Sequence, residues 1–139
     1  MTKAEIFTFL NKNLACHLAT SEGNKPHVRG IRIYQASEDG IILQTTKIKD
    51  LHKQLSENPE VELCFNNYAD NVQVRVSGRL ERIEDLALKK EIVSKRKFLQ
   101  PWVEQRGGYD FIAVYCLKNG VATVWTMAAN FDPKTYIQL

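Results

Sequence analysis

The sequence predicts a mainly β fold, an antiparallel Greek-key barrel with peripheral helices. Short runs of alternating apolar and polar residues recur along the chain, and turn signals rich in Gly, Asn or Asp separate them. Only three segments carry a helical period instead. No linker, repeat or low-complexity stretch divides the 139 residues, so we expect one domain over residues 1–139.

Composition narrows the classes of protein to consider. The net charge of +3 is mild and the basic residues are mixed with acids, so we expect no nucleic-acid partner. No apolar run is long enough to cross a bilayer and no signal-peptide pattern opens the chain, so we expect a cytoplasmic protein. The three cysteines match neither a disulfide framework nor a metal signature, so we expect reduced thiols and no metal site.

The first two elements are a helix and a strand. Thr2 and Glu5 have the spacing of a capping box, which predicts a short helix. The run Leu14 to Thr20 is apolar at nearly every position, which predicts a strand covered on both faces. We interpret His17 within this run as a satisfied core histidine, with a ligand role as the alternative.

The second strand, Pro26 to Tyr34, carries two arginines. Strand alternation puts Arg29 on one face and Arg32 on the other, each among apolar residues. In a strand that only packs against a core, charged and apolar residues would lie on different faces. We therefore expect at least one of the two arginines to have an anionic partner. That partner is either a bound ligand or an Asp or Glu at the sheet edge, and the residues favour the two explanations about equally.

A strand-to-helix turn suited to phosphate follows. Asp39-Gly40 predicts a hairpin, and the next strand ends at Gln44-Thr45-Thr46. Lys47 and Lys49 then lead into a short helix, Leu51 to Asn58. Hydroxyls, ammonium groups and the free amides of a helix N-terminus together favour a phosphate, although Thr and Lys also occupy ordinary exposed turns.

The second half of the chain returns to strands around one helical excursion. Val61 to Phe65 and Val72 to Ile83 alternate as strands, with a bulge or close approach expected at Gly78. Asp85 to Phe98 is helical in character, and we expect Pro101 and Gly107-Gly108 to interrupt it.

The chain closes with two more strands and an apolar tail. Phe111 to Leu117 and Val121 to Thr126 flank Lys118-Asn119-Gly120, which predicts a two-strand hairpin. We expect the tail from Met127 to Leu139 to pack on the domain or across a dimer.

These pieces, in this order, resemble the pyridoxamine 5'-phosphate oxidase-like, FMN-binding split-barrel family, especially its small general-stress-protein-like members. The resemblance implies a split β-barrel, FMN as the cofactor, and a homodimer with two FMN sites at its interface. The matching segments are LACHLAT, GNKPHVRGIRIY, DGIILQTT, KIKDLHKQLSENPEVEL, VQVRVSGRLERIED and YDFIAVYCLKNGVATVW.

The resemblance also implies site residues. Arg29 would pair with the FMN phosphate, the residues around it would lend backbone groups to the flavin edge, and Gln73 would reach the flavin from the partner subunit. Trp125 is either close to the ring or plain core. The implied cofactor-binding residues are Val28, Arg29, Gly30, Ile31, Arg32, Gln44, Thr45, Thr46, Lys47, Lys49, Gln73 and Trp125.

Two departures from the family pattern modify this expectation. Lys49 and Leu51 stand where many relatives carry Ser and Lys, and Asp50 puts an acid near the phosphate, where it helps only as a helix cap. The closing arginine-histidine motif of true pyridoxamine phosphate oxidases is absent, so we do not expect vitamin B6 oxidation.

The function implied is an FMN-dependent oxidoreductase acting between a small-molecule electron donor and acceptor. The residues identify no catalytic side chain. The alternatives are a flavin- or haem-binding stress protein without turnover and a nitroimidazole-reductase-like enzyme.

Overall fold

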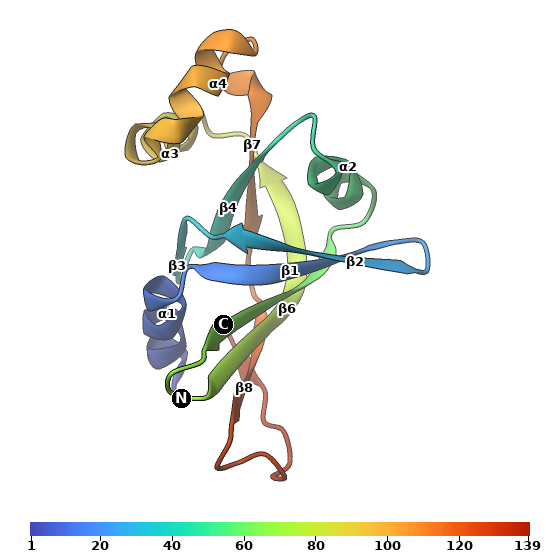
Figure 1. Ribbon diagram of the computed structural model, residues 1–139, viewed down its shortest axis with the longest axis vertical. Helices are drawn as coiled ribbons and strands as arrows, with labels where there is room; N and C mark the ends of the chain where they lie inside the picture. The colour runs from blue at the N-terminus through green and yellow to red at the C-terminus, as the bar shows by residue number, and fades with distance from the viewer.

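The computed structural model describes residues 1–139 and shows an open antiparallel barrel (Figure 1). The sheet runs in the order β2-β1-β5-β6-β7-β4-β3, β8 pairs with β6 and β9, and the outermost strands β2 and β3 do not pair. The predicted antiparallel barrel is therefore confirmed, in a split form. The strands are β1 (Ala15–Glu22), β2 (Lys25–Arg32), β3 (Gln35–Ser37), β4 (Gly40–Thr46), β5 (Glu60–Asn67), β6 (Val72–Ile83), β7 (Ile112–Leu117), β8 (Val121–Thr126) and β9 (Ile137–Gln138).

Strand β6 joins the two halves of the barrel. Its first part, Val72 to Ser77, pairs with β8, and its last part, Leu80 to Ile83, pairs with β7. Gly78 lies at this change of partner, where an added Cβ would lie 3.0 Å from a methyl group of Leu117. The close approach predicted at Gly78 is confirmed.

The predicted hairpin of β7 and β8 is wrong. Strand β7 pairs with β4 and β6, whereas β8 pairs with β6 and β9. The turn Lys118-Asn119-Gly120, with Asn119 at a φ of 54°, does not reverse the chain, because β7 and β8 run in the same direction along β6; it carries the chain from one half of the barrel to the other. Because β6 offers a partner to each strand, the two strands do not pair with each other.

Four α-helices surround the barrel, namely α1 (Lys3–Lys12), α2 (Asp50–Glu57), α3 (Leu86–Lys95) and α4 (Gln100–Gln105), with 3-10 turns at Lys97–Leu99 and Tyr109–Phe111. The predicted capping box is confirmed, because Thr2 Oγ1 accepts from the Glu5 amide at 3.2 Å and the Glu5 carboxylate accepts from the Thr2 amide at 2.7 Å. Pro101 does not interrupt a helix. It lies in the first turn of α4, where its missing N–H costs little.

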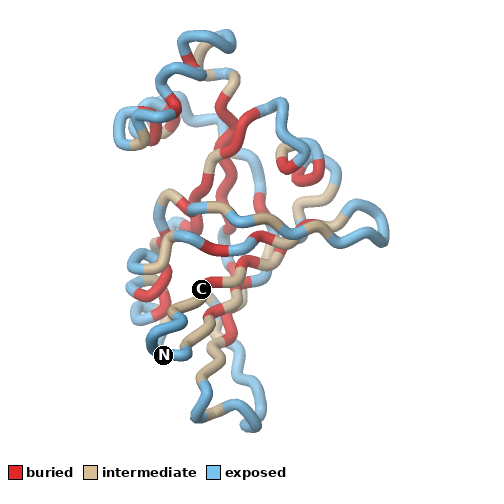
Figure 2. Tube along the Cα trace, viewed as in Figure 1, coloured by how far each residue is buried: buried red, intermediate tan, exposed pale blue.

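Buried residues form two cores (Figure 2). The main core fills the barrel and takes in apolar side chains of α1 and α2. A smaller core packs Ile92, Leu99 and Val103 of the excursion against Ile42 and Val114 of β4 and β7. This second core holds α3 and α4 beside the end of β4.

Strand β1 is buried on one face only, so the expectation of two covered faces is wrong. Cys16, Leu18 and Thr20 are buried, whereas Ala15 and His17 are exposed. His17 is therefore not a core histidine.

The tail folds back on the domain. Strand β9 pairs with β8, and the Leu139 amide donates to the Gly120 carbonyl at 2.8 Å. Phe131, between the two strands, stays 96% exposed. No helix has the length and apolar character needed to span a bilayer.

Candidate functional site

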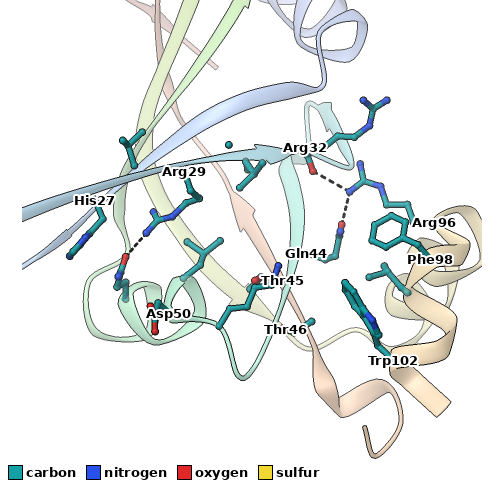
Figure 3. Close-up of a pocket in the computed structure, with 17 residues that line it drawn as sticks. His27, Arg29, Arg32, Gln44, Thr45, Thr46, Asp50, Arg96, Phe98 and Trp102 are labelled. Atoms are coloured by element: carbon teal, nitrogen blue, oxygen red, sulfur yellow. Dashed lines mark hydrogen bonds between the residues drawn. The ribbon is translucent and has the colours of Figure 1, made fainter. Parts of the chain in front are cut away.

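A pocket of about 570 Å³ opens between the edge strand β2, the end of β4, helix α2 and the α3–α4 segment (Figure 3). This volume is in the usual range for small-molecule sites. Nine of the twelve predicted residues line it, namely Val28, Arg29, Gly30, Ile31, Arg32, Gln44, Thr45, Thr46 and Lys49.

Strand β2 offers unpaired backbone groups to the pocket. The Ile33 amide donates to the Leu14 carbonyl at 3.0 Å, at the end of the β1–β2 ladder. Because bonded and non-bonded pairs alternate in an antiparallel ladder, the N–H and C=O groups of Val28, Gly30 and Arg32 point away from β1. Of these, the Arg32 carbonyl accepts from Arg96. A planar ligand with polar edges can bind these groups directly.

Arg29 is held in the pocket by neutral acceptors. Its Nη1 donates to Thr20 Oγ1 at 2.8 Å and to the Leu18 carbonyl at 3.3 Å, and its Nη2 donates to Gln54 Oε1 at 2.5 Å. Burial lowers the pKa of the Arg29 guanidinium, and the charge of Asp50 acts in the opposite direction. Arg29 is therefore partly desolvated and fixed in orientation.

Neither arginine of β2 forms an ion pair. The ion pairs with a separation of 4.0 Å or less involve other basic residues, such as Arg79 and Arg82. None of them involves Arg29 or Arg32. The sheet-edge salt-bridge explanation is therefore wrong. Both charges remain available to an anionic ligand.

Arg96, which the sequence argument did not single out, ties the helical excursion to the pocket. Its Nη1 donates to Gln44 Oε1 at 2.7 Å and to the Arg32 carbonyl at 3.1 Å, and its Nη2 donates to the Ile33 carbonyl. Its guanidinium lies 5.5 Å from the centre of the Tyr34 ring. Burial, and then the charge of Arg32, lower the pKa of Arg96.

Two buried polar atoms of pocket residues lack a hydrogen-bond partner. They are Thr45 Oγ1 and His27 Nε2, and Thr45 is only 5% exposed. An unsatisfied buried polar group costs about 1–3 kcal/mol, so natural structures retain few of them without a reason. Both residues line the pocket.

The N-terminus of α2 adds open donors. The first-turn amides of a helix have no intrahelical partner, and the N-cap residue Lys49 makes no side-chain hydrogen bond to them. Asp50 is the first helical residue and not the cap, which corrects the expectation for it. Its carboxylate also lines the pocket, beside Arg29.

Three predicted residues lie outside the pocket. Lys47 does not line it. Gln73 and Trp125 are paired across β6 and β8, on the face that points away from the barrel core. Gln73 Nε2 donates to Asn66 Oδ1 at 2.9 Å, and the half-buried Trp125 donates to Asn130 Oδ1 at 2.8 Å.

The pocket also contains residues that sequence reasoning missed. His27 shares its strand face with Arg29, and this alternation was the available signal. The remaining residues come from segments other than β2. Among them, only Phe98 and Trp102 stand out in the sequence, because they are bulky aromatic residues in a charged segment. The missed residues are His27, Gln54, Arg96, Phe98, Leu99 and Trp102; Asp50 and Leu51, which the sequence already put near the phosphate, also line the pocket.

The fold and the pocket together define a class: an open antiparallel barrel with an anion-suited site at its edge strand. The sequence profile of the family described as pyridoxamine 5'-phosphate oxidase matches residues 2–108. The chain belongs to this family, which confirms the resemblance identified from its motifs.

Among curated relatives, the pyridoxine/pyridoxamine 5'-phosphate oxidase of Pelagibacter ubique (strain HTCC1062) is 29% identical over 79 residues. The match covers 56% of this chain and 38% of that protein.

Solved structures share the fold over nearly the whole chain. A NimC/NimA family protein from Clostridium acetobutylicum has a TM-score of 0.79 at 20% identity, covering 98% of this chain and 92% of that one. General stress protein 26 from Bacillus anthracis has a TM-score of 0.71 at 18% identity and full coverage of both chains. A pyridoxamine 5'-phosphate oxidase-related, FMN-binding protein from Nostoc punctiforme has a TM-score of 0.69 at 18% identity, covering 96% and 87%.

Proposed function

We propose that this protein is a flavin-binding oxidoreductase that holds FMN in the pocket beside β2. The observation that carries the proposal is Arg29, a partly desolvated cation without a carboxylate partner, next to a helix N-terminus with open amides. A phosphate needs positive charge and several donors, and this end of the pocket has both. The FMN-binding description of the Nostoc structure supports the choice of flavin.

Specific residues would hold each part of the cofactor. Arg29, Lys49 and Thr45 would bind the phosphate, with Thr46 beside them at the end of β4. The unpaired peptide groups of β2 would bind the polar edge of the ring system. When bound, the flavin supplies reversible one- and two-electron chemistry, and the protein supplies position and electrostatics.

The proposal includes a homodimer. Gln73 lies away from the pocket of its own chain, so it can reach a flavin only in the pocket of a second copy.

The cofactor assignment is tested by absorption spectroscopy of the purified protein and of Arg29→Ala. We expect a flavin spectrum in the unmodified protein and about a tenfold or greater loss of FMN affinity in Arg29→Ala, because charged hydrogen bonds contribute about 1.5–3 kcal/mol. Arg79→Ala is the matched control, since Arg79 is exposed and outside the pocket. Unchanged FMN retention in a folded Arg29→Ala protein would rule out its phosphate role.

Turnover is a separate measurement. Bleaching of the flavin band by NADH or NADPH, and its return on adding an acceptor, supports the oxidoreductase. Flavin that binds but never cycles favours a binding protein instead. Reduction of a nitroimidazole at the bound flavin would favour the nitroreductase alternative, and a haem spectrum would overturn the flavin assignment.

A further inference from the structure

Helix α2 has two faces with different partners. Its first turn and Gln54 line the pocket. Gln54 Oε1 accepts from Arg29 Nη2 at 2.5 Å and from Thr20 Oγ1 at 2.7 Å, so this face of the helix fixes the guanidinium that would bind the phosphate (Figure 3). His52 lies on the opposite face, because positions 52 and 54 are about 200° apart around a helix. A change at His52 therefore reaches the pocket only through the position of the helix.

The face with His52 is attached to β7 by one short hydrogen bond. The hydroxyl of the buried Tyr115 lies 2.7 Å from His52 Nδ1, and this nitrogen accepts only in the neutral ring that carries its proton on Nε2. The other acceptor within reach is the His52 carbonyl, which lies 3.5 Å from the Tyr115 hydroxyl and already accepts from Ser56 Oγ at 2.8 Å. Tyr115 therefore has a good acceptor only while His52 is neutral.

The charges around His52 also oppose its protonation. Arg82 of β6 and Lys47 of the turn before α2 both act on the ring, and together with burial they lower the pKa of His52. Glu84 is the acid of this cluster, but its carboxylate pairs with Arg82 at 2.5 Å and with Lys89 at 3.4 Å. A proton on His52 would add a positive charge beside two others, with no carboxylate to receive it.

We propose that the His52–Tyr115 pair is an acid-sensitive latch: protonation of His52 releases one face of α2 from β7 and weakens the flavin site that the other face builds. This inference rests on the proposed function for the flavin. The released helix binds a proton that the latched helix excludes, so acid shifts the population toward the released helix. Release loosens Gln54 and with it Arg29, so FMN affinity falls.

The charge of the FMN phosphate acts in the opposite direction. Through space, a bound phosphate would attract a protonated His52, although Arg29 and Lys49 at the pocket offset much of that charge. Coupling between two sites is reciprocal. The latch therefore predicts that bound FMN lowers the pKa of His52, whereas the phosphate charge alone would raise it.

The latch is tested by measuring FMN affinity at pH 7.5 and pH 5.5, by fluorescence titration of FMN, in the unmodified protein and in His52→Gln. We expect acid to weaken the unmodified protein at least tenfold more than His52→Gln, because a Gln amide can accept from Tyr115 at both pH values. The FMN phosphate, which titrates at about pH 6, and His27 of the pocket are the same in both proteins, so their effects cancel. An equal loss in the two proteins, or a larger loss in His52→Gln, would overturn the inference.

Tyr115→Phe is a second variant that keeps the histidine. It removes the hydroxyl, so the latch is absent at both pH values. We expect weaker FMN binding already at pH 7.5 and a smaller further loss at pH 5.5. Tyr136→Phe is the matched control, because Tyr136 is exposed and outside the pocket. A folded Tyr115→Phe protein that matches the unmodified protein at both pH values would overturn the latch.

The direction of the coupling is read by NMR titration of the His52 ring. Its midpoint should lie at a lower pH with FMN bound than without FMN. A midpoint that rises on FMN binding is the result expected from the phosphate charge alone, and it would overturn the latch.

Hydrogen exchange in the flavin-free protein separates the two proposals. After correction for the intrinsic rates, the α2 amides should exchange at least tenfold faster at pH 5.5 than at pH 7.5 in the unmodified protein, and not in His52→Gln. A protein that binds FMN but shows no such change overturns this inference and leaves the proposed function standing. A protein that binds no flavin overturns the proposed function, and exchange of the α2 amides still decides whether acid releases the helix.

Discussion

Single residues in the pocket carry polar groups that the chain does not fully satisfy. Thr45 Oγ1 is buried without a partner, and Arg29 is partly desolvated without a carboxylate. Both lower the stability of the isolated protein, because a buried polar or charged group without full compensation is unfavourable. A ligand that hydrogen-bonds to Thr45 Oγ1 or pairs with the Arg29 guanidinium removes this cost and gains affinity from it.

Thr45→Val should therefore have opposite effects on stability and on binding. Valine replaces a hydroxyl that makes no hydrogen bond, so we expect the flavin-free protein to gain about 1 kcal/mol in its free energy of unfolding, measured by urea denaturation. FMN affinity should fall about fivefold, because the same hydroxyl is lost to the phosphate.

Thr123→Val is the control for this pair of effects. Thr123 is also buried, but its Oγ1 donates to the Thr135 carbonyl at 2.9 Å, so its loss should destabilise the protein. If Thr45→Val destabilises the flavin-free protein as much as Thr123→Val does, Thr45 has a partner that the structure does not show.

At the scale of elements, the turn between β7 and β8 decides how the two halves of the barrel join. It brings Gly120 against Leu117 and Val76, where an added Cβ would lie 2.6 Å from Leu117 Cδ2 and 2.8 Å from Val76 Cγ1. Both neighbours are buried in the main core and have little room to move.

Gly120→Ala should lower the free energy of unfolding by about 1–3 kcal/mol, the usual cost of overpacking a core. Chemical denaturation of the flavin-free protein measures this. Gly30→Ala is the matched control, because no atom lies within 4 Å of a Cβ there, and its effect should stay within about 0.5 kcal/mol. Equal stability of the two variants would contradict the close packing at Gly120.

Helix α2 is attached to β7 through a histidine. The Tyr115 hydroxyl lies 2.7 Å from His52 Nδ1, and the two rings meet edge-on with centroids 6.0 Å apart. Burial lowers the pKa of His52, and the charges of Arg82 and Lys47 lower it further. The folded protein therefore resists protonation of this ring.

This pKa shift predicts that the protein loses stability as the pH is lowered. Below the ordinary histidine pKa of about 6.5, the unfolded chain binds a proton at His52 that the folded chain excludes, so stability rises with pH across this window and is lost as pH falls. The drop in urea midpoint from pH 7.5 to 5.5 should be smaller in His52→Gln. His17→Gln, which changes an exposed histidine, should keep the full drop, and an unchanged drop in His52→Gln would contradict the assignment.

At the scale of the whole molecule, the α3–α4 excursion and the loop between β8 and β9 project from opposite ends of the barrel (Figure 1). The pocket lies near the first end. Gln73 and Trp125 lie on strands that lead to the second, on the outward face of β6 and β8. Any contact of Gln73 with a flavin therefore requires two copies of the chain.

Gln73→Ala tests the proposed dimer. In a dimer, we expect the substitution to shift the flavin spectrum or weaken FMN binding about fivefold, the loss of one hydrogen bond. Sedimentation reports the oligomeric state, and Ser77→Ala, on the same outward face of β6, is the control. An unperturbed spectrum in an intact Gln73→Ala dimer would exclude the cross-subunit contact.

Local features of the sequence determined most elements and half of the pocket. The capping box at Thr2, the strand with Arg29 and Arg32, and the Thr45-Thr46 turn each follow from patterns within a few residues, and the structure has all three. Alternation, capping and turn chemistry act over short distances, so these patterns suffice for such features.

Only the tertiary structure decided which strands pair, which face of β1 is covered, and what forms the far wall of the pocket. The tight turn after Leu117 predicted a hairpin, but β6 competes for both strands. Arg96 meets the Arg32 carbonyl from 64 positions away, and it does so because the second core docks α3 and α4 beside β4. Contacts of this kind depend on packing between distant segments, which local sequence patterns do not encode.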